Sequence, residues 1–306
     1  MQKIFITSLF TLSITIVAFA QKNINGNLVV NNTKRDYILH LPPGYMSVQP
    51  LPLVMIFHGG GGNSEQMQKY FGMDAIADKE KFITVYPNSI NKNWNDGREF
   101  KEAVKAIDDV DFINRLLDTL EKNYAINTRR IFATGISNGG FFSYYLSYKM
   151  STRLLAVSPV CASIPEQLYK EFYPPNPISI MMMNGTKDPL VPYEGGKVGN
   201  VFTGSRGNCS STTSTLARYI EVNHTNTTPE ITTLENRDND DGCTAVEYTY
   251  SNGNNNTSVI LVKVINGGHA VPGCSQYLSK FIIGKVCKDF NGNEMIWSFF
   301  KDCVSK

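Results

Sequence analysis

Ser137 stands at the centre of a Gly-x-Ser-x-Gly motif formed by residues 135–139. The apolar segment 130–134 predicts a strand before the motif, and residues 139–149 predict a helix after it. A serine on so sharp a turn has a strained backbone, and small neighbours on both sides avoid a clash. The turn lifts the hydroxyl above the sheet edge, toward a substrate. This context predicts a nucleophile for acyl transfer, whereas an ordinary glycine-rich turn would not require the strand and the helix.

A serine hydroxyl is a weak nucleophile, so it needs a general base and a group that orients the base. In this arrangement an acid and then a histidine follow the serine along the chain. Two histidines come after Ser137. His224 lies in a segment rich in threonine and asparagine, which predicts an exposed loop. His269 follows Asn266-Gly267-Gly268 at the end of an apolar run, so we expect it to be the base.

Asp188 is the acid expected to orient the histidine. It lies in a turn after residues 178–183, an apolar segment that predicts a strand ending at the same edge of the sheet. Three other aspartates are rivals, but they lie in polar sequence with no strand before them, which predicts a solvated loop: Asp238, Asp240 and Asp241.

A glycine-rich loop supplies a second expected part of the site. Residues 58–62 read His-Gly-Gly-Gly-Gly and come directly after the apolar run 51–57. Such a loop lets bare backbone N–H groups approach a substrate oxygen. We therefore expect the N–H groups of Gly60 and Asn138 to bind the oxyanion, and His58 to be structural. A phosphate-binding loop is the alternative, but the lysine and hydroxyl residue that it needs are missing.

The cysteines and histidines do not form a metal-binding pattern. The chain has six cysteines without a C-x-x-C pair, and its four histidines are scattered. We expect no metal and no other cofactor.

The elements around these residues alternate between strands and helices. Continuous apolar runs predict central strands at 51–57, 82–86, 130–134, 154–160 and 178–183. Helical patterns lie between or after them at 64–77, 108–124, 139–149 and 210–222, and a last helix is expected at 293–303. Hairpins are expected around 31–32 and around 251–254. This order predicts the α/β class, with a mostly parallel sheet and helices on both faces.

With these motifs in place, the chain resembles the secreted polyhydroxybutyrate depolymerase and feruloyl esterase family of α/β-hydrolases, which is close to carbohydrate esterase family one. The resemblance runs over nearly the whole chain after the N-terminal segment, and these stretches carry it: 35–37, 41–45, 52–59, 108–113, 130–140, 184–192 and 267–273. It implies a triad of Ser137, Asp188 and His269, with the oxyanion held at Gly60 and Asn138.

The chain departs from this family at two positions near the expected site. Val271 replaces a tryptophan that often follows the catalytic histidine, and Gly60 stands where many members have cysteine. These differences leave the triad intact and bear on the substrate. Trp94, in a polar loop after the strand at 82–86, is either a surface that stacks on a sugar or feruloyl ring or a packed loop anchor. We expect Trp94 and Val271 to contribute to substrate binding.

The N-terminal residues 1–20 predict a secretory signal peptide. Lys3 precedes an apolar stretch, and Ala18-Phe19-Ala20 forms a small-x-small cleavage site. The stretch is short for a membrane anchor, so we expect a secreted protein. The formal net charge is +2, which gives no basis for nucleic acid or an anionic membrane as a partner.

Export makes disulfide bonds plausible for the six cysteines. Six cysteines allow fifteen pairings, so the sequence leaves the choice open. We favour Cys274 with Cys287, because they bracket one loop, and Cys209 with Cys243 would fix a second region. Cys161 follows an apolar run and is expected to be a buried thiol.

These observations predict a single catalytic domain at 21–306 that hydrolyses carboxylic esters through an acyl-enzyme. Feruloyl or acetyl esters on plant polysaccharide are the expected substrates, and a polyhydroxybutyrate polyester is the alternative. An inactive carbohydrate-binding protein on the same scaffold and a serine peptidase also stay open. The sequence decides neither the oligomeric state nor the presence of a lid.

Overall fold

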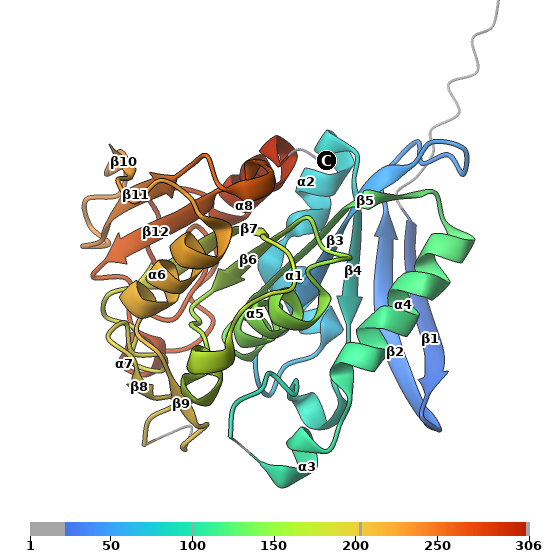
Figure 1. Ribbon diagram of the computed structural model, residues 1–306, viewed down its shortest axis with the longest axis horizontal. Coiled ribbons are helices and arrows are strands. Elements are labelled where there is room, and N and C mark those ends of the chain that lie inside the picture. Colours follow the sequence, from blue (N-terminus) through green and yellow to red (C-terminus); the bar gives the residue numbers. More distant parts are fainter. Residues whose placement is uncertain (1–21, 100, 202–203, 304–306) are drawn as a thin grey trace, which may run out of the picture.

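The computed structural model describes residues 22–99, 101–201 and 204–303, which are coloured in Figure 1. Its strands are β1 Lys22–Val30, β2 Thr33–Leu41, β3 Leu51–Phe57, β4 Ile83–Pro87, β5 Ile126–Ile136, β6 Ala156–Val160, β7 Ser179–Gly185, β8 Gly196–Lys197, β9 Asn208–Cys209, β10 Glu230–Thr233, β11 Thr244–Tyr250 and β12 Val259–Ile265. Its α-helices are α1 Ser64–Phe71, α2 Met73–Glu80, α3 Glu102–Lys105, α4 Asp109–Asn123, α5 Asn138–Met150, α6 Thr212–Asn223, α7 Lys280–Ile283 and α8 Gly292–Asp302. Short 3-10 turns occur at Ile90–Lys92, Glu166–Glu171 and Asn254–Asn256.

Ten of the described strands form one sheet, in the order β1-β2-β4-β3-β5-β6-β7-β12-β11-β10. Neighbouring strands from β4 to β12 are parallel. The pairs at both ends of the sheet are antiparallel. The parallel strands β3, β5, β7 and β12 therefore end at the same edge, where the loops that follow them meet. This mostly parallel sheet confirms the predicted fold class.

The sheet separates two apolar cores, and Figure 1 shows helices on both of its faces. Helices α4, α5 and α6 bury rings such as Phe112 and Phe142 against one face. Helices α1, α2 and α8 cover the other face. There Phe300 of α8 stacks on Phe132 of β5, with 4.6 Å between the ring centroids. Because both faces are covered, the central strands are apolar without alternation, as the sequence predicts.

The predicted helix at 64–77 is two helices. Gly72 ends α1 in the left-handed conformation, with φ 63°, and its N–H donates to the carbonyl of Gln68. Helix α2 begins at Met73, directly after this turn. A glycine adopts this conformation at low cost, so one residue is enough to break a continuous helical pattern.

The N-terminal hairpin has the predicted turn. Asn31 and Asn32 have φ values of 50° and 60°, and Val30 pairs with Thr33 across them. Two successive residues with positive φ form the type of turn whose twist matches that of the strands.

The cysteines differ from the predicted pairing. All six lie among the described residues and have free thiols, so the bonds Cys274–Cys287 and Cys209–Cys243 are not present in the structure. The thiol of Cys287 instead donates to Oδ2 of Asp289 at 3.5 Å, and its interaction with the thiol of Cys243 lowers the pKa of Cys243. Cys161 is a buried thiol, as predicted.

Asp241 holds the Cys243 and Cys287 segments together. Its two carboxylate oxygens accept from the backbone N–H groups of Cys243 and Lys288, each at 2.6 Å. Asp241 is buried, so the prediction that it belongs to a solvated loop is wrong. The surrounding sequence is polar, but the side chain is needed to satisfy two backbone donors.

The predicted signal peptide lies outside the described residues. Within the described part of the chain, no helix combines the length and the apolar character needed to cross a membrane.

Candidate active site

Ser137 lies between β5 and α5, as the motif predicts. Its backbone has φ 58° and ψ −122°, a conformation that non-glycine residues rarely adopt. Hydrogen bonds on both sides maintain this turn: the N–H of Ser137 donates to the carbonyl of Val160 at 3.0 Å, and its own carbonyl accepts from Phe141 at 2.8 Å. Strain of this kind costs about 1–3 kcal/mol and persists only where the surrounding structure enforces it. The half-buried side chain of Ser137 reaches the cavity described below.

The two glycines of the motif are required by the end of β3. A Cβ on Gly135 would lie 2.6 Å from the carbonyl oxygen of Phe57, and a Cβ on Gly139 would lie closer still to the same atom. Only glycine lets the turn approach this backbone. The spacing Gly-x-Ser-x-Gly is therefore explained by the contact between the Ser137 turn and the strand that leads into the glycine-rich loop.

Asp188 and His269 form a hydrogen-bonded pair. The Nδ1 of His269 is 2.7 Å from Oδ2 of Asp188, and both side chains are 2% exposed. The other carboxylate oxygen of Asp188 accepts from the N–H groups of Leu190 and Val191, at 2.8 and 2.9 Å. With its Nδ1 hydrogen donated to Asp188, His269 has Nε2 left to accept a proton.

Glycines let the loops after β7 and β12 approach one another. A Cβ on Gly185 would overlap the carbonyl of Gly267, and a Cβ on Gly268 would lie 2.6 Å from the Cα of Gly284. The N–H of His269 donates to the carbonyl of Ile283 at 2.5 Å. The Asn-Gly and Gly-Gly-His sequences thus position the acid and the base that the sequence predicts.

Ser137 and His269 line one cavity of about 670 Å³. Its other walls come from the glycine-rich loop, from α1, from the segments after β7 and β8, and from the loop before α7. Tyr70 and Tyr277 form part of this lining, and their rings pack edge to face with centroids 5.2 Å apart. The hydroxyl of Tyr277 also donates to the carbonyl of His269 at 3.0 Å, which supports the histidine loop.

The predicted oxyanion donors are backbone N–H groups at the start of α5 and in the glycine-rich loop. Asn138 is the first residue of α5, so its N–H has no acceptor within the helix. In the glycine-rich loop, the N–H of Gly61 donates to Lys92 and that of Gly62 donates to Gly59. Among the described residues, no backbone carbonyl accepts from Gly60. The N–H groups of Gly60 and Asn138 thus remain the predicted oxyanion donors.

His58 is a structural residue, in line with its predicted role. Its Nδ1 is 2.8 Å from the carbonyl of Gly59, and its Nε2 accepts from the N–H of Ser89 at 3.2 Å. Burial lowers the pKa of His58 to about 4. A neutral imidazole therefore connects the start of the glycine-rich loop to the segment after β4.

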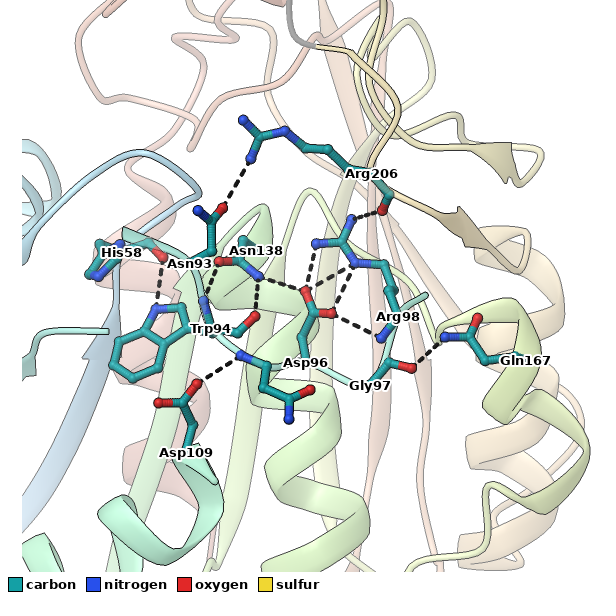
Figure 2. A network of polar contacts seen from close by, with 11 residues as sticks. His58, Asn93, Trp94, Asp96, Gly97, Arg98, Asp109, Asn138, Gln167 and Arg206 are labelled. Atoms are coloured by element: carbon teal, nitrogen blue, oxygen red, sulfur yellow. Dashed lines mark hydrogen bonds and ion pairs between the residues drawn. The ribbon is translucent and has the colours of Figure 1, made fainter. Parts of the chain in front are cut away.

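Trp94 is an interior anchor, so the prediction that it contacts a substrate is wrong. Its side chain is 1% exposed and stacks on Phe142, with 4.8 Å between centroids. Its Nε1 donates to the carbonyl of His58 at 3.1 Å (Figure 2). Val271 is likewise buried, and its N–H donates to Tyr70. Neither Trp94 nor Val271 lines the cavity, because both side chains are buried in the core. The prediction that Val271 contributes to substrate binding is therefore also wrong.

Sequence reasoning missed a buried polar network around the side chain of Asn138, which Figure 2 shows. The side-chain Nδ2 of Asn138 donates to Asp96 at 2.6 Å, and its Oδ1 accepts from the N–H of Trp94 at 2.8 Å. Arg98 donates to Oδ2 of the same aspartate through Nε and Nη2. The guanidinium of Arg98 also lies 3.8 Å from the ring centroid of Phe141. The only sequence signal is an Asp-x-Arg spacing in a polar loop, which is too common to interpret.

Cys161 was also missed as a neighbour of the acid and base. The Sγ of Cys161, a carboxylate oxygen of Asp188 and a ring nitrogen of His269 lie within 4.8 Å of one another. Its Sγ is 3.6 Å from the carbonyl of Ala270. Burial, and then the negative charge of Asp188, raise the pKa of this thiol. The thiol of Cys161 therefore stays protonated and can donate a hydrogen bond to the carbonyl of Ala270. We assign no metal to these three residues, because Asp188 and His269 already bond to each other.

Comparisons with known proteins relate this chain to esterases. Residues 30–190 match the family model Esterase, described as "Putative esterase". Feruloyl esterase C of Emericella nidulans is 29% identical over 180 residues, which cover 56% of this chain and 62% of that protein. NocK of Nocardia uniformis subsp. tsuyamanensis, which is named as an esterase, is 29% identical over 170 residues, 55% of this chain and 49% of that protein. The chain thus spans about half to two thirds of the length of these curated relatives.

A solved structure extends the likeness in fold. The acetyl xylan esterase from Aspergillus awamori superposes with a TM-score of 0.54 over 83% of this chain and 95% of that chain, at 14% identity. A thermostable esterase gives a TM-score of 0.51 over 65% of this chain and 52% of that chain, at 16% identity. At such identities these likenesses concern the fold alone.

Proposed function

This chain belongs to the Esterase family, and on that premise we propose that it is a secreted serine esterase that hydrolyses carboxylic esters through an acyl-enzyme. The observation that carries the proposal is that the strained Ser137 and His269, which is bonded to the buried Asp188, line one cavity. A nucleophile, a base and an orienting acid on one cavity are the minimum that acyl transfer by serine requires.

In the proposed reaction, the Oγ of Ser137 attacks the ester carbonyl carbon while Nε2 of His269 takes the hydroxyl proton. Asp188 stabilises the imidazolium that forms. The electron pair of the carbonyl moves onto its oxygen, and the N–H groups of Gly60 and Asn138 bind that oxyanion. Collapse of the tetrahedral intermediate breaks the ester bond, and His269 gives its proton to the leaving alcohol. Water then repeats these steps on the acyl-enzyme and releases the acid.

Replacement of the nucleophile tests the mechanism. Ser137→Ala should abolish burst release of nitrophenol from p-nitrophenyl acetate, because no acyl-enzyme can form. Ser147→Ala is the matched control, since it removes a buried serine hydroxyl from α5 that bonds to Tyr219 rather than to the site. Full activity in Ser137→Ala would refute the proposed nucleophile.

For the substrate, we propose feruloyl or acetyl esters on plant polysaccharide. The relatives named as feruloyl esterase C support the feruloyl class, and a relative named as a bifunctional acetylxylan esterase/xylanase supports the acetyl class. Release of ferulate from methyl ferulate and of acetate from acetylated xylan should therefore exceed clearing of a polyhydroxybutyrate suspension. The opposite order would identify a polyester depolymerase. Glycan binding without turnover of any ester would instead identify a binding protein.

We also propose that residues 21–306 form the mature, exported catalytic domain. The signal-peptide pattern of residues 1–20 supports export. Expression of the full chain in a bacterial host, followed by N-terminal sequencing of the exported protein, should give Gln21 as the first residue. Retention of the intact N-terminus on a protein that stays in the cytoplasm would contradict this part of the proposal.

A further inference from the structure

Arg206 brings a positive charge to the cavity above Ser137. It comes from the segment between β8 and β9 and is half-buried. Its guanidinium lies over the glycine-rich loop, because a Cβ on Gly60 would collide with its Nη1 atom. The same Nη1 donates to Oδ1 of Asn93 at 3.4 Å. The cation is therefore next to an amide that the proposed mechanism uses for the oxyanion.

The buried network fixes the position of this arginine, as Figure 2 shows. Arg98, held by Asp96, donates through Nη1 to the carbonyl of Arg206 at 3.1 Å. On its other side, the N–H of Arg206 donates to Val198 at 2.9 Å, and Val198 in turn donates to Gly207. A surface arginine samples many rotamers in water, whereas this one starts from a backbone that is held on both sides.

The cavity has an excess of positive charge. Among the described residues that line it there is no aspartate or glutamate, while Arg206 and Lys69 each contribute a cation. Partial burial, and then the nearby charge of Arg98, lower the pKa of Arg206, and Asp96 only partly opposes them. The guanidinium stays charged in any case. A negative charge on a bound molecule would complement the two cations that line the cavity.

We propose that Arg206 forms an anion subsite and that the ester substrate carries a carboxylate, as in an ester on a polysaccharide with uronic acid residues. This inference rests on the proposed function, because it names the substrate class of the same cavity. A guanidinium recognises a carboxylate through two parallel N–H donors, which gives orientation as well as affinity. The carboxylate can belong to the acyl group or to the alcohol, and the two sources require separate tests.

Two matched pairs of esters test the subsite. On the alcohol side, 3-acetoxybenzoate is compared with the neutral 3-acetoxybenzamide. On the acyl side, the mono-p-nitrophenyl ester of glutaric acid is compared with its glutaramide analogue. The wild-type protein should prefer the charged member of at least one pair, and that pair identifies the side of the ester that faces Arg206. Added salt should weaken the preference.

The arginine is then changed in two ways. Arg206→Gln should lower kcat/KM for the preferred charged ester by about 10-fold to 100-fold, the range expected for a charge-assisted hydrogen bond. Its activity on the neutral partner ester should change less than about threefold, which also shows that the variant folds. Arg206→Lys keeps the positive charge but not the two parallel N–H donors, so its kcat/KM for the charged ester should lie between those of the wild type and of Arg206→Gln. Lys122→Gln removes one exposed cation from α4 and should leave both esters unaffected.

Three outcomes would overturn the inference. Equal hydrolysis of the charged and neutral esters by the wild-type protein would mean that the cavity does not distinguish charged from neutral substrates. Parallel losses on both esters in Arg206→Gln would mean that the arginine supports the glycine-rich loop instead. In both of these cases the proposed esterase function survives. If the wild-type protein hydrolyses none of the four esters, the proposed function fails and the inference fails with it.

Discussion

Replacing Asp96 by asparagine should destabilise the protein strongly while changing its chemistry little. Asp96 and Arg98 form an ion pair whose side chains are 3% and 2% exposed. The pair makes two contacts of 3.0 Å or less, from Nε and Nη2 of Arg98 to one carboxylate oxygen. Without the carboxylate, the guanidinium of Arg98 stays buried and loses its counter-charge. Breaking a buried pair from one side costs about 3–5 kcal/mol.

The expected effect on catalysis is smaller, because Asp96 contacts the side chain of Asn138 and not its backbone N–H. The N–H that is proposed to bind the oxyanion belongs to the backbone, which α5 and the close approach of Gly139 to Phe57 hold in place. Asparagine also keeps an oxygen that can accept from Nδ2 of Asn138. At a temperature where the variant is folded, kcat on a neutral ester should fall by less than about tenfold, compared with the 100-fold to 1,000-fold loss of an oxyanion donor.

A double-mutant cycle measured by urea unfolding separates the pair from its surroundings. Arg98→Met removes the orphaned charge, so adding it to Asp96→Asn should cost less than the sum of the two single changes, by about 2 kcal/mol or more. Two results would refute the reasoning. A loss below about 1 kcal/mol in Asp96→Asn would mean that the pair is not dehydrated as the structure indicates. A kcat loss of 100-fold would mean that Asp96 acts in the oxyanion site itself.

Three further predictions concern other parts of the site. The folded pKa of His58 is about 4, against 6.5 in an unfolded chain, so its contribution to stability is complete above pH 6.5 and is lost as the pH falls toward 4. Wild-type protein should lose about 2 kcal/mol from this residue between pH 7 and pH 5 in urea titrations, and His58→Asn should lack that part of the pH dependence. Gly139→Ala should lower the melting temperature, because its Cβ overlaps the carbonyl of Phe57, at a cost of about 1–3 kcal/mol or more; an unchanged melting temperature would contradict the assigned role. In a refolding buffer that contains oxidised glutathione, peptide mapping should find a disulfide between Cys243 and Cys287, whose thiols interact electrostatically in the reduced protein; a Cys274–Cys287 bond would show this interpretation to be incorrect.

The three residues of the proposed triad could be placed from sequence because each follows its own strand. Ser137, Asp188 and His269 come after β5, β7 and β12, and each lies in a short glycine-containing turn. Parallel strands end at a common edge, so local signals that are far apart in the chain point to one place. Here the hydrophobic pattern and the turn chemistry indicate the same geometry, and the structure agrees with both.

Trp94 shows where this reasoning fails. Its neighbours are polar, which predicts an exposed loop, yet the indole is buried against Phe142 and beside Phe57. Its burial depends on the space that β3 and α5 leave between them, and no local pattern reports that space. The same limit applies to the proximity of Cys243 and Cys287, because the buried Asp241 carboxylate joins the residue before β11 to the N–H of Lys288.

Two different tasks divide the cavity. One part could be predicted from the sequence, and the other could not. Bond making and breaking require atoms placed to within a fraction of an ångström, and rigid strand ends with glycine turns provide that placement. The rest of the cavity is lined by α1, Tyr277 and Arg206, which come from segments with weak local signals, and we propose that this part recognises the substrate. Arg98 joins the two parts, because it contacts Asp96 beneath Asn138 and also the carbonyl of Arg206. We therefore expect a change in the segment between β8 and β9 to alter which ester is accepted while leaving the proposed reaction at Ser137 intact.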